Sequence, residues 1–200
     1  TALGREAAMN VTSGGENVAI GKLALATATT ATLNVAVGNE ALRLTNTGGA
    51  NVGVGRESGY SGTTHSGSVY IGEQAGYGAA TGNENIAIGH NAMGGGTIAG
   101  DRNIAIGVNS GDALTSGYQN VLLGGEAGGA INSGYLNTII GYQSGQALTS
   151  GIANTIIGWQ AGYSLQTGHN NIFIGRESGY NVTTTIQNVI AIGHGAGKGV

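Results

Sequence analysis

The stretch "NTIIGYQSGQALTSGIANTIIG", residues 137–158, contains the same short motif twice, at a spacing of 17 residues. The motif is an asparagine, three strand-forming residues that end on an aliphatic side chain, and a glycine. It recurs along the whole chain at intervals of 17 or 18 residues. Its closing glycines are Gly4, Gly21, Gly38, Gly55, Gly72, Gly89, Gly107, Gly124, Gly141, Gly158, Gly175 and Gly193. A fixed period of this length is typical of solenoids, in which each repeat forms one turn. We therefore predict an all-β fold, a parallel β-solenoid or β-roll of about twelve turns, with residues 1–200 forming a single repetitive segment.

The composition supports a repetitive coil. The chain has 41 glycines in 200 residues, no proline and no cysteine, yet 40% of it is hydrophobic. The lack of proline and of a three-residue glycine period argues against collagen, and the ordered aliphatic residues argue against a flexible linker. We therefore expect the glycines to lie at turns.

Charge is scarce in this sequence. Only 8% of the residues are charged, and the formal net charge is −3. Such a chain has no basic stripe that could neutralise nucleic-acid phosphates, and no polybasic patch for anionic lipids. It also has no apolar run of the roughly 20 residues that a membrane helix needs. We expect neither nucleic acid nor membrane insertion among its interactions.

Each repeat is predicted to contribute one short strand. The residue before the motif glycine is aliphatic in every copy, as at Ile140, and the residue two positions earlier is mostly β-branched, as at Val121. Because side chains alternate along a strand, we expect both columns to face the core. A further column lies seven residues after the motif glycine and is predicted to form the second inward wall: Leu114, Ile131, Leu148, Leu165 and Val182.

Asparagine opens most copies of the motif. Identical amides that stack one strand spacing apart can bond to one another along the axis of a solenoid. We predict a structural ladder of Asn17, Asn34, Asn51, Asn85, Asn103, Asn120, Asn137, Asn154 and Asn171.

The middle residue of each strand is predicted to point outward, between the two inward columns. No copy carries a charge there, and the later copies are large and apolar: Leu122, Ile139, Ile156 and Phe173. Soluble monomers avoid a contiguous apolar stripe of this kind. We therefore expect these residues to pack between chains, and a homotrimer is the assembly that we favour.

The repeats resemble a known group of fibrous proteins. The strings "NIAIGHNA" (85–92), "NTIIGYQSGQALTSG" (137–151) and "NTIIGWQAGYSLQTGHNNIFIG" (154–175) are similar to the repeats of phage tail fibres and to the head repeats of trimeric autotransporter adhesins. The resemblance covers nearly the whole chain. It implies a trimeric fibre, located on the virion or on the outside of a bacterial cell. One departure is that the two halves of each turn here differ by three residues, whereas the halves of those adhesin repeats are nearly equal.

Titratable residues do not converge in the sequence. Five glutamates share the position two residues after the motif glycine, but only Glu40 and Glu57 lie on adjacent turns. The four histidines are scattered, and there is no cysteine. We expect no catalytic residue, no metal site and no cofactor.

Aromatic residues give a second hypothesis. Tyr142 and Trp159 occupy one column, and Tyr163 and Tyr180 occupy another. Exposed aromatic columns can contact glycans, although packing between chains explains them at least as well.

The leading functional hypothesis is a structural shaft or stalk of a tail fibre or surface adhesin that supports attachment, and not an enzyme. Its partners would be sister chains and a host-surface glycan or protein receptor. The alternatives are a lateral surface that binds glycans and, less favoured, a solenoid enzyme that cleaves polysaccharides.

Overall fold

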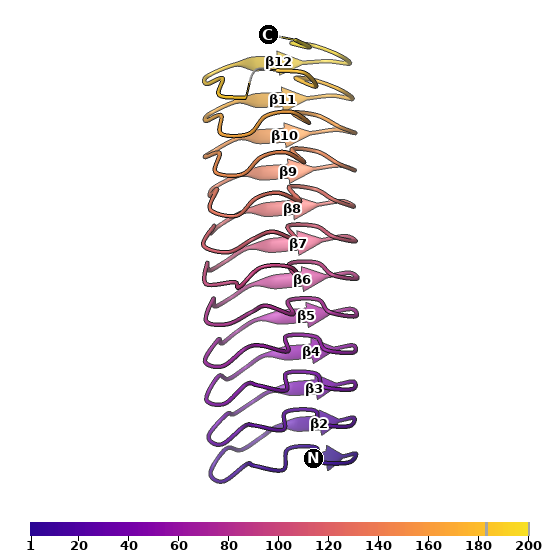
Figure 1. Ribbon diagram of the computed structural model, residues 1–200, viewed down its shortest axis with the longest axis vertical. Coiled ribbons are helices and arrows are strands. Elements are labelled where there is room, and N and C mark those ends of the chain that lie inside the picture. The colour runs from indigo at the N-terminus through magenta and orange to yellow at the C-terminus, as the bar shows by residue number, and fades with distance from the viewer. Residues whose placement is uncertain (183, 200) are drawn as a thin grey trace.

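The computed structural model describes residues 1–182 and 184–199, and it contains β-strands without helices in this part of the chain. Twelve strands form one parallel sheet in sequential order (Figure 1). The strands are β1 (Ala2–Leu3), β2 (Val18–Ile20), β3 (Val35–Val37), β4 (Val52–Val54), β5 (Val69–Ile71), β6 (Ile86–Ile88), β7 (Ile104–Ile106), β8 (Val121–Leu123), β9 (Thr138–Ile140), β10 (Thr155–Ile157), β11 (Ile172–Ile174) and β12 (Ile190–Ile192). The predicted β-solenoid is confirmed.

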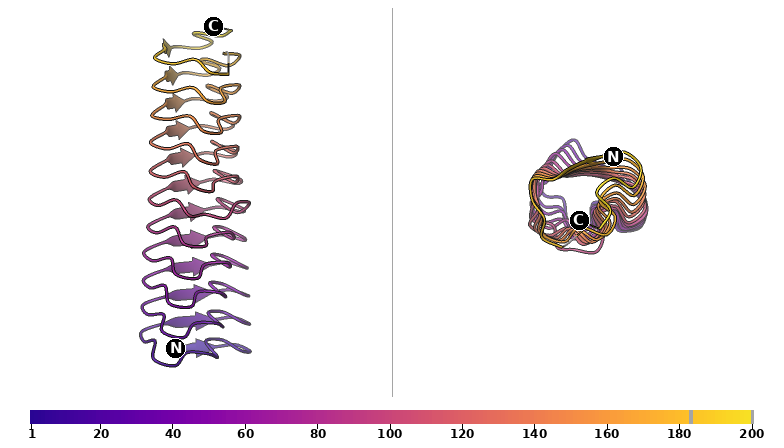
Figure 2. Two further views of the ribbon diagram at one scale, coloured as in Figure 1. Left: turned by 60° about the vertical axis from the view of Figure 1, so that its left-hand side comes forward. Right: turned by 90° about the horizontal axis from the view of Figure 1, so that it is seen from above.

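Equivalent residues of successive turns lie directly above one another. In β9 and β10, for example, Ile139 pairs with Ile156 and Ile140 with Ile157. Seen along the axis, the turns follow nearly the same closed outline (Figure 2). At ~4.8 Å per strand spacing, twelve strands give a sheet about 53 Å long.

The strands face the opposite way from the sequence prediction. Their middle residues are buried inside the coil, and the two flanking residues point outward. Ala105 at the centre of β7 is fully buried, for instance, whereas Ile106 beside it is 39% exposed. The expectation that Leu122, Ile139, Ile156 and Phe173 pack between chains is therefore wrong, because all four are fully buried in the core of their own chain.

A size match across the core explains why the middle residues point inward. The facing wall contributes the residue four positions after the motif glycine. Where that residue is large, as at Leu42, the neighbouring strand residues are small, as at Gly53, on which a Cβ would lie 2.7 Å from Leu42 Cγ. Where it is glycine, a strand residue of the same or the next turn is in most cases large: a Cβ on Gly179 would lie 2.9 Å from the ring of Phe173. The two walls interlock, so neither can be turned over without voids and clashes.

The motif glycine closes each strand with a backbone conformation that other residues rarely adopt. At Gly141, φ is +133°, and an added Cβ would lie 2.5 Å from the carbonyl oxygen of Gly158 in the next turn. Both the backbone conformation and the close stacking therefore require glycine at this position.

The second inward wall lies where the sequence places it. Leu114, Ile131, Leu148 and Leu165 are fully buried, and Val182 is 4% exposed. Each of the first four is followed three residues later by a glycine, which leaves room for the larger side chain. A Cβ on Gly151 would lie 2.4 Å from Leu148 Cδ1.

The asparagines form a hydrogen-bonded ladder along one corner. Asn137 donates to Asn120 Oδ1 through both its backbone N–H, at 3.1 Å, and its Nδ2, at 3.0 Å. Asn120 Nδ2 also donates to the carbonyl of Gly134, at 2.8 Å. The pattern repeats from Asn17 to Asn171, with Ser68 as the one substitute on this ladder. The ladder thus satisfies buried main-chain groups in almost every turn.

Candidate functional surfaces

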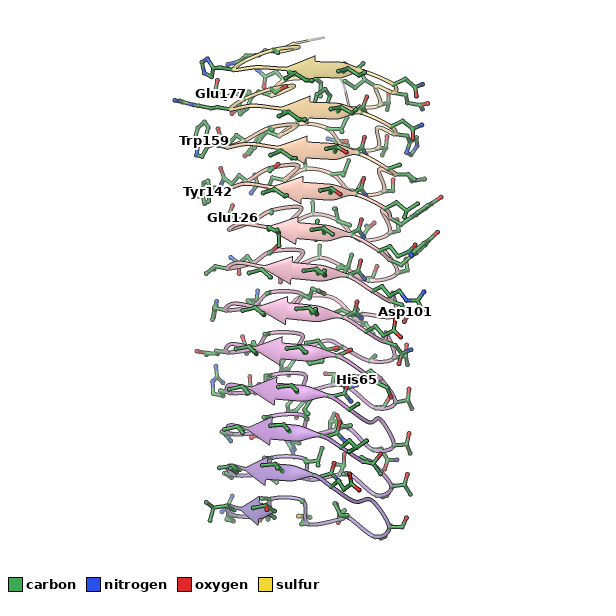
Figure 3. The ribbon with its side chains drawn as sticks, turned by 180° about the vertical axis from the view of Figure 1, so that it is seen from behind. His65, Asp101, Glu126, Tyr142, Trp159 and Glu177 are labelled. Atoms are coloured by element: carbon green, nitrogen blue, oxygen red, sulfur yellow. The ribbon has the colours of Figure 1, made fainter. Side chains whose placement is uncertain are left out.

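The outward face of the sheet is a continuous apolar surface. We call it the sheet face and define it by the first and third residues of β2–β12. Apart from Thr138 and Thr155, every one of these residues is valine, isoleucine or leucine. They are half-buried or exposed, and Figure 3 shows the sheet from the side on which they stand. The apolar surface inferred from the sequence therefore exists, but different columns form it.

The predicted aromatic contacts are divided between exposed positions, at Tyr142 and Trp159, and half-buried ones, at Tyr163 and Tyr180. Tyr142 is 49% and Trp159 is 41% exposed, and both lie at the edge where the strands end (Figure 3). The guanidinium of Arg176 covers the ring of Trp159, with 4.9 Å between Cζ and the centroid. Tyr163 and Tyr180 stack on each other with their centroids 5.2 Å apart. The rings of Trp159, Tyr163 and Tyr180 already contact neighbouring turns, which is a structural use of the aromatic columns.

The glutamate column is tied to cations and amides at most of its levels. Glu40 pairs with Arg43 at 2.9 Å, and Glu57 pairs with Arg56 at 3.1 Å. At Glu177, the hydrogen bond from Lys198 lowers the pKa of the carboxyl group. The structure thus supplies cationic partners for the two adjacent carboxylates, Glu40 and Glu57, that the sequence singled out.

A groove opens on the lateral surface between Asp112 and Tyr163. Its cavity volume is about 410 Å³, and it spans four turns of the coil. Its lining residues are Asn109, Asp112, Glu126, Gly129, Ala130, Gln146, Ala147 and Tyr163. Burial raises the pKa of the Asp112 carboxyl group. The volume lies within the range of small-molecule sites.

Sequence reasoning did not find this groove, although one signal was present. The position five residues after the motif glycine carries tyrosine at Tyr60, Tyr77, Tyr163 and Tyr180, but glycine at Gly129. The groove is the space that the missing side chain leaves between larger neighbours.

A second unpredicted feature is a polar cluster inside the coil. His65 is fully buried, and neither ring nitrogen has a hydrogen-bond partner among the described residues. Burial lowers the pKa of His65 to about 4. Its ring lies against Tyr70, with 5.5 Å between the centroids, and burial also raises the pKa of the Tyr70 hydroxyl. His65 stands where most other turns have glycine. Its ring fills the space beside Gly62, at a position that carries leucine or isoleucine in four of the later turns, as at Leu114.

Within residues 1–182 and 184–199, no three His, Asp or Glu side chains are grouped so that they could hold a metal ion. The same residues include no helix of the length and hydropathy that a membrane crossing requires.

Fold and surfaces together define a repetitive parallel β-solenoid with an apolar sheet face and a lateral groove. No family model, no curated protein and no solved structure matches this chain.

Proposed function

We propose that this chain is a shaft or stalk segment of a homotrimeric fibre, carried on a virus particle or a bacterial surface, where it supports attachment. The observation that carries the proposal is the sheet face. Three strand residues of ~3.3 Å each and a length of about 53 Å give this face an area on the order of 500 Å². The largest apolar patch on a typical monomer has a similar area, about 300–600 Å². Each partner in a standard protein–protein interface contributes roughly 800 Å², so the sheet face could supply a large part of one such contribution.

The character of the sheet face also favours sister chains as its cover. Branched aliphatic side chains repeat at every strand and no charged side chain interrupts them, so a second copy meets the same pattern at the same spacing. Identical elongated chains that share an axis close most simply with cyclic symmetry. The resemblance of the repeats to trimeric fibre proteins favours three chains over two.

The coil has the mechanical properties that such a role needs. Main-chain hydrogen bonds join each turn to the next, as from Gly141 to Leu123 at 2.7 Å and from Gly158 to Ile140 at 2.8 Å. Length can be added one turn at a time without redesigning the core. A rod of this kind can hold an attachment tip at a distance from the particle.

The mass of the protein in solution tests this proposal. Light scattering is expected to give about three times the chain mass of 19.7 kDa. The double substitution Ile88→Lys and Ile106→Lys places two charges on adjacent strands of the sheet face and should dissociate the assembly. Val108→Lys is the matched control, because Val108 is 52% exposed but lies outside the sheet face. A monomeric wild-type protein that stays soluble would contradict the proposal.

Glycan recognition by the lateral surface is the second candidate function. One observation favours it: the groove at Gly129 combines an aromatic ring, carboxylates and an apolar floor. This combination is typical of small-molecule sites, where a few polar groups orient a ligand on apolar walls.

A further inference from the structure

The groove lies on the wall of the coil that faces away from the sheet. Gly128 and Ile131 point into the core, because a Cβ on Gly128 would lie 2.9 Å from both Ile131 Cδ1 and Leu122 Cδ2. Gly129 and Ala130 lie between these two inward positions and form the outer surface of the same wall. A cover over the sheet face therefore leaves the groove open.

One end of the groove is an aromatic ring with a free face. Tyr163 stacks on Tyr180 in the following turn, which occupies one side of its ring. In the preceding turn the same column holds Gln146, whose Nε2 donates to Glu126 Oε2 at 2.9 Å. Gln146 thus reaches towards the earlier turns and away from Tyr163. The second face of Tyr163 borders the groove, where a flat ring could continue the stack.

The other end of the groove is acidic. Glu126 Oε2 accepts hydrogen bonds from Gln143 and Gln146, and Asp112 Oδ1 accepts one from Asn91. Neither carboxylate forms a salt bridge within the described part of the chain, unlike Glu40, Glu57 and Glu177 in the same column as Glu126. The groove therefore presents negative charge without a cation of its own.

We propose that this groove binds a saccharide unit that carries a protonated amine, such as a 2-amino-2-deoxyhexose within an oligosaccharide. The apolar face of the sugar ring stacks on Tyr163, and the ammonium group donates to Glu126 and Asp112. Gly129, Ala130 and Ala147 form the floor, where larger side chains would exclude the ring. The proposal deepens the second candidate function and is independent of the trimeric shaft.

Two matched oligosaccharides and one simple amine test the proposal by calorimetric titration. The tetramer of β-1,4-linked glucosamine carries the amines, the corresponding N-acetylglucosamine tetramer has the same backbone without charge, and spermidine has the charge without a ring. The glucosamine tetramer is expected to bind at least tenfold more tightly than either of the others. Its affinity should fall as salt is added, because its ammonium groups meet carboxylates at a solvent-exposed site.

Two variants locate the binding site. Glu126→Gln removes one charge but keeps the shape, and it should weaken binding roughly tenfold, as expected for a charge-assisted hydrogen bond. Gly129→Tyr fills the groove and should abolish binding. The backbone tolerates this change, because an added Cβ on Gly129 meets no atom closer than 3.5 Å and other turns carry tyrosine there. Glu40→Gln is the control at the equivalent position of another turn and should leave binding unchanged.

Several outcomes would overturn the proposal. Equal binding of the charged and acetylated tetramers would remove the role of the carboxylates, and equal binding of spermidine would remove the role of the ring. No binding of the glucosamine tetramer, or unchanged binding in Gly129→Tyr, would exclude the groove as its site. Circular dichroism and the mass of each variant are measured alongside the titrations. A failure of the trimer proposal is thereby distinguished from a failure of the proposal that the groove binds an amino sugar.

Discussion

The asparagine ladder allows a quantitative test of what holds the turns together. Asn120 is fully buried at the centre of the ladder. Its Oδ1 accepts the backbone N–H of Asn137 at 3.1 Å, and its Nδ2 donates to the carbonyl of Gly134 at 2.8 Å. Neither main-chain group has another hydrogen bond within the described residues. Asn120→Ala leaves the N–H of Asn137 and the carbonyl of Gly134 without a partner. Both groups are buried, so water can replace the lost side chain only if the turn distorts.

The expected cost follows from these two groups. An unsatisfied buried polar group costs about 1–3 kcal/mol, so Asn120→Ala should lower the free energy of unfolding by about 2–6 kcal/mol. Asn120→Ser should cost less, because the hydroxyl can still accept the N–H of Asn137. The chain already contains this arrangement at Ser68, whose Oγ accepts the backbone N–H of Asn85 at 3.1 Å.

Urea unfolding followed by circular dichroism measures these differences, and hydrogen exchange locates them. Asn132→Ala is the control, since Asn132 is exposed and, within residues 1–182 and 184–199, its side chain bonds only to Ser133. It should change stability by less than about 0.5 kcal/mol. Faster exchange in Asn120→Ala should centre on the amide of Asn137. A loss below about 1 kcal/mol would refute the reasoning, because the ladder would then be replaceable by water.

Three further predictions concern the core and its glycines. The pKa of His65 is about 4 in the folded state, whereas its ordinary value is 6.5. The unfolded chain therefore takes up a proton on His65 before the folded chain does. Acidification from pH 6.5 to 4 should lower the free energy of unfolding by up to about 3 kcal/mol. The double substitution Gly62→Leu and His65→Gly should remove this pH dependence of stability in urea titrations. An unchanged pH dependence would show that another titratable group causes it. Phe173→Ala should cost about 3–5 kcal/mol by calorimetry or urea unfolding, and a cost below about 1 kcal/mol would contradict its place in the core. Gly141→Ala should cost at least about 2 kcal/mol because of its positive φ and the carbonyl above it, whereas Gly129→Ala should be nearly neutral; equal costs would show that backbone conformation does not distinguish them.

The repeat length and the aliphatic and asparagine columns are periodic features, which is why the sequence predicts the stacked coil so well. Identical spacing forces identical positions, whatever the cross-section of the turn. The direction of each side chain is a different kind of information. Alternation along a strand shows that the middle residue opposes its neighbours, but it does not show which side is the interior. With strands of three residues and apolar side chains on both sides, hydrophobicity alone could not decide.

The size relation between two columns could have decided it. Small strand residues such as Ala36 accompany a large residue at the facing position, Leu42, while large ones such as Phe173 accompany Gly179. Side chains on an outer surface have no reason to match the size of residues six positions later, whereas side chains that meet across a narrow core must do so. The groove was missed for a related reason, because it depends on the size of one residue, Gly129, among neighbours in three other turns.

The corrected face strengthens the physical argument for self-association. Had the middle residues pointed outward, the large aliphatic side chains would have been confined to the later turns, since the earlier strands other than β5 carry alanine or glycine there, as at Ala36 and Gly53. The columns that do point outward are aliphatic in nearly every strand from β2 to β12. A partner that packs against this face along the entire rod must itself repeat with the spacing of the strands. A parallel copy of the same solenoid has that repeat. The same logic separates the two proposed surfaces: the sheet face is uniform along the axis and suits a sister chain, whereas the groove at Gly129 is confined to four turns and suits a ligand of limited size.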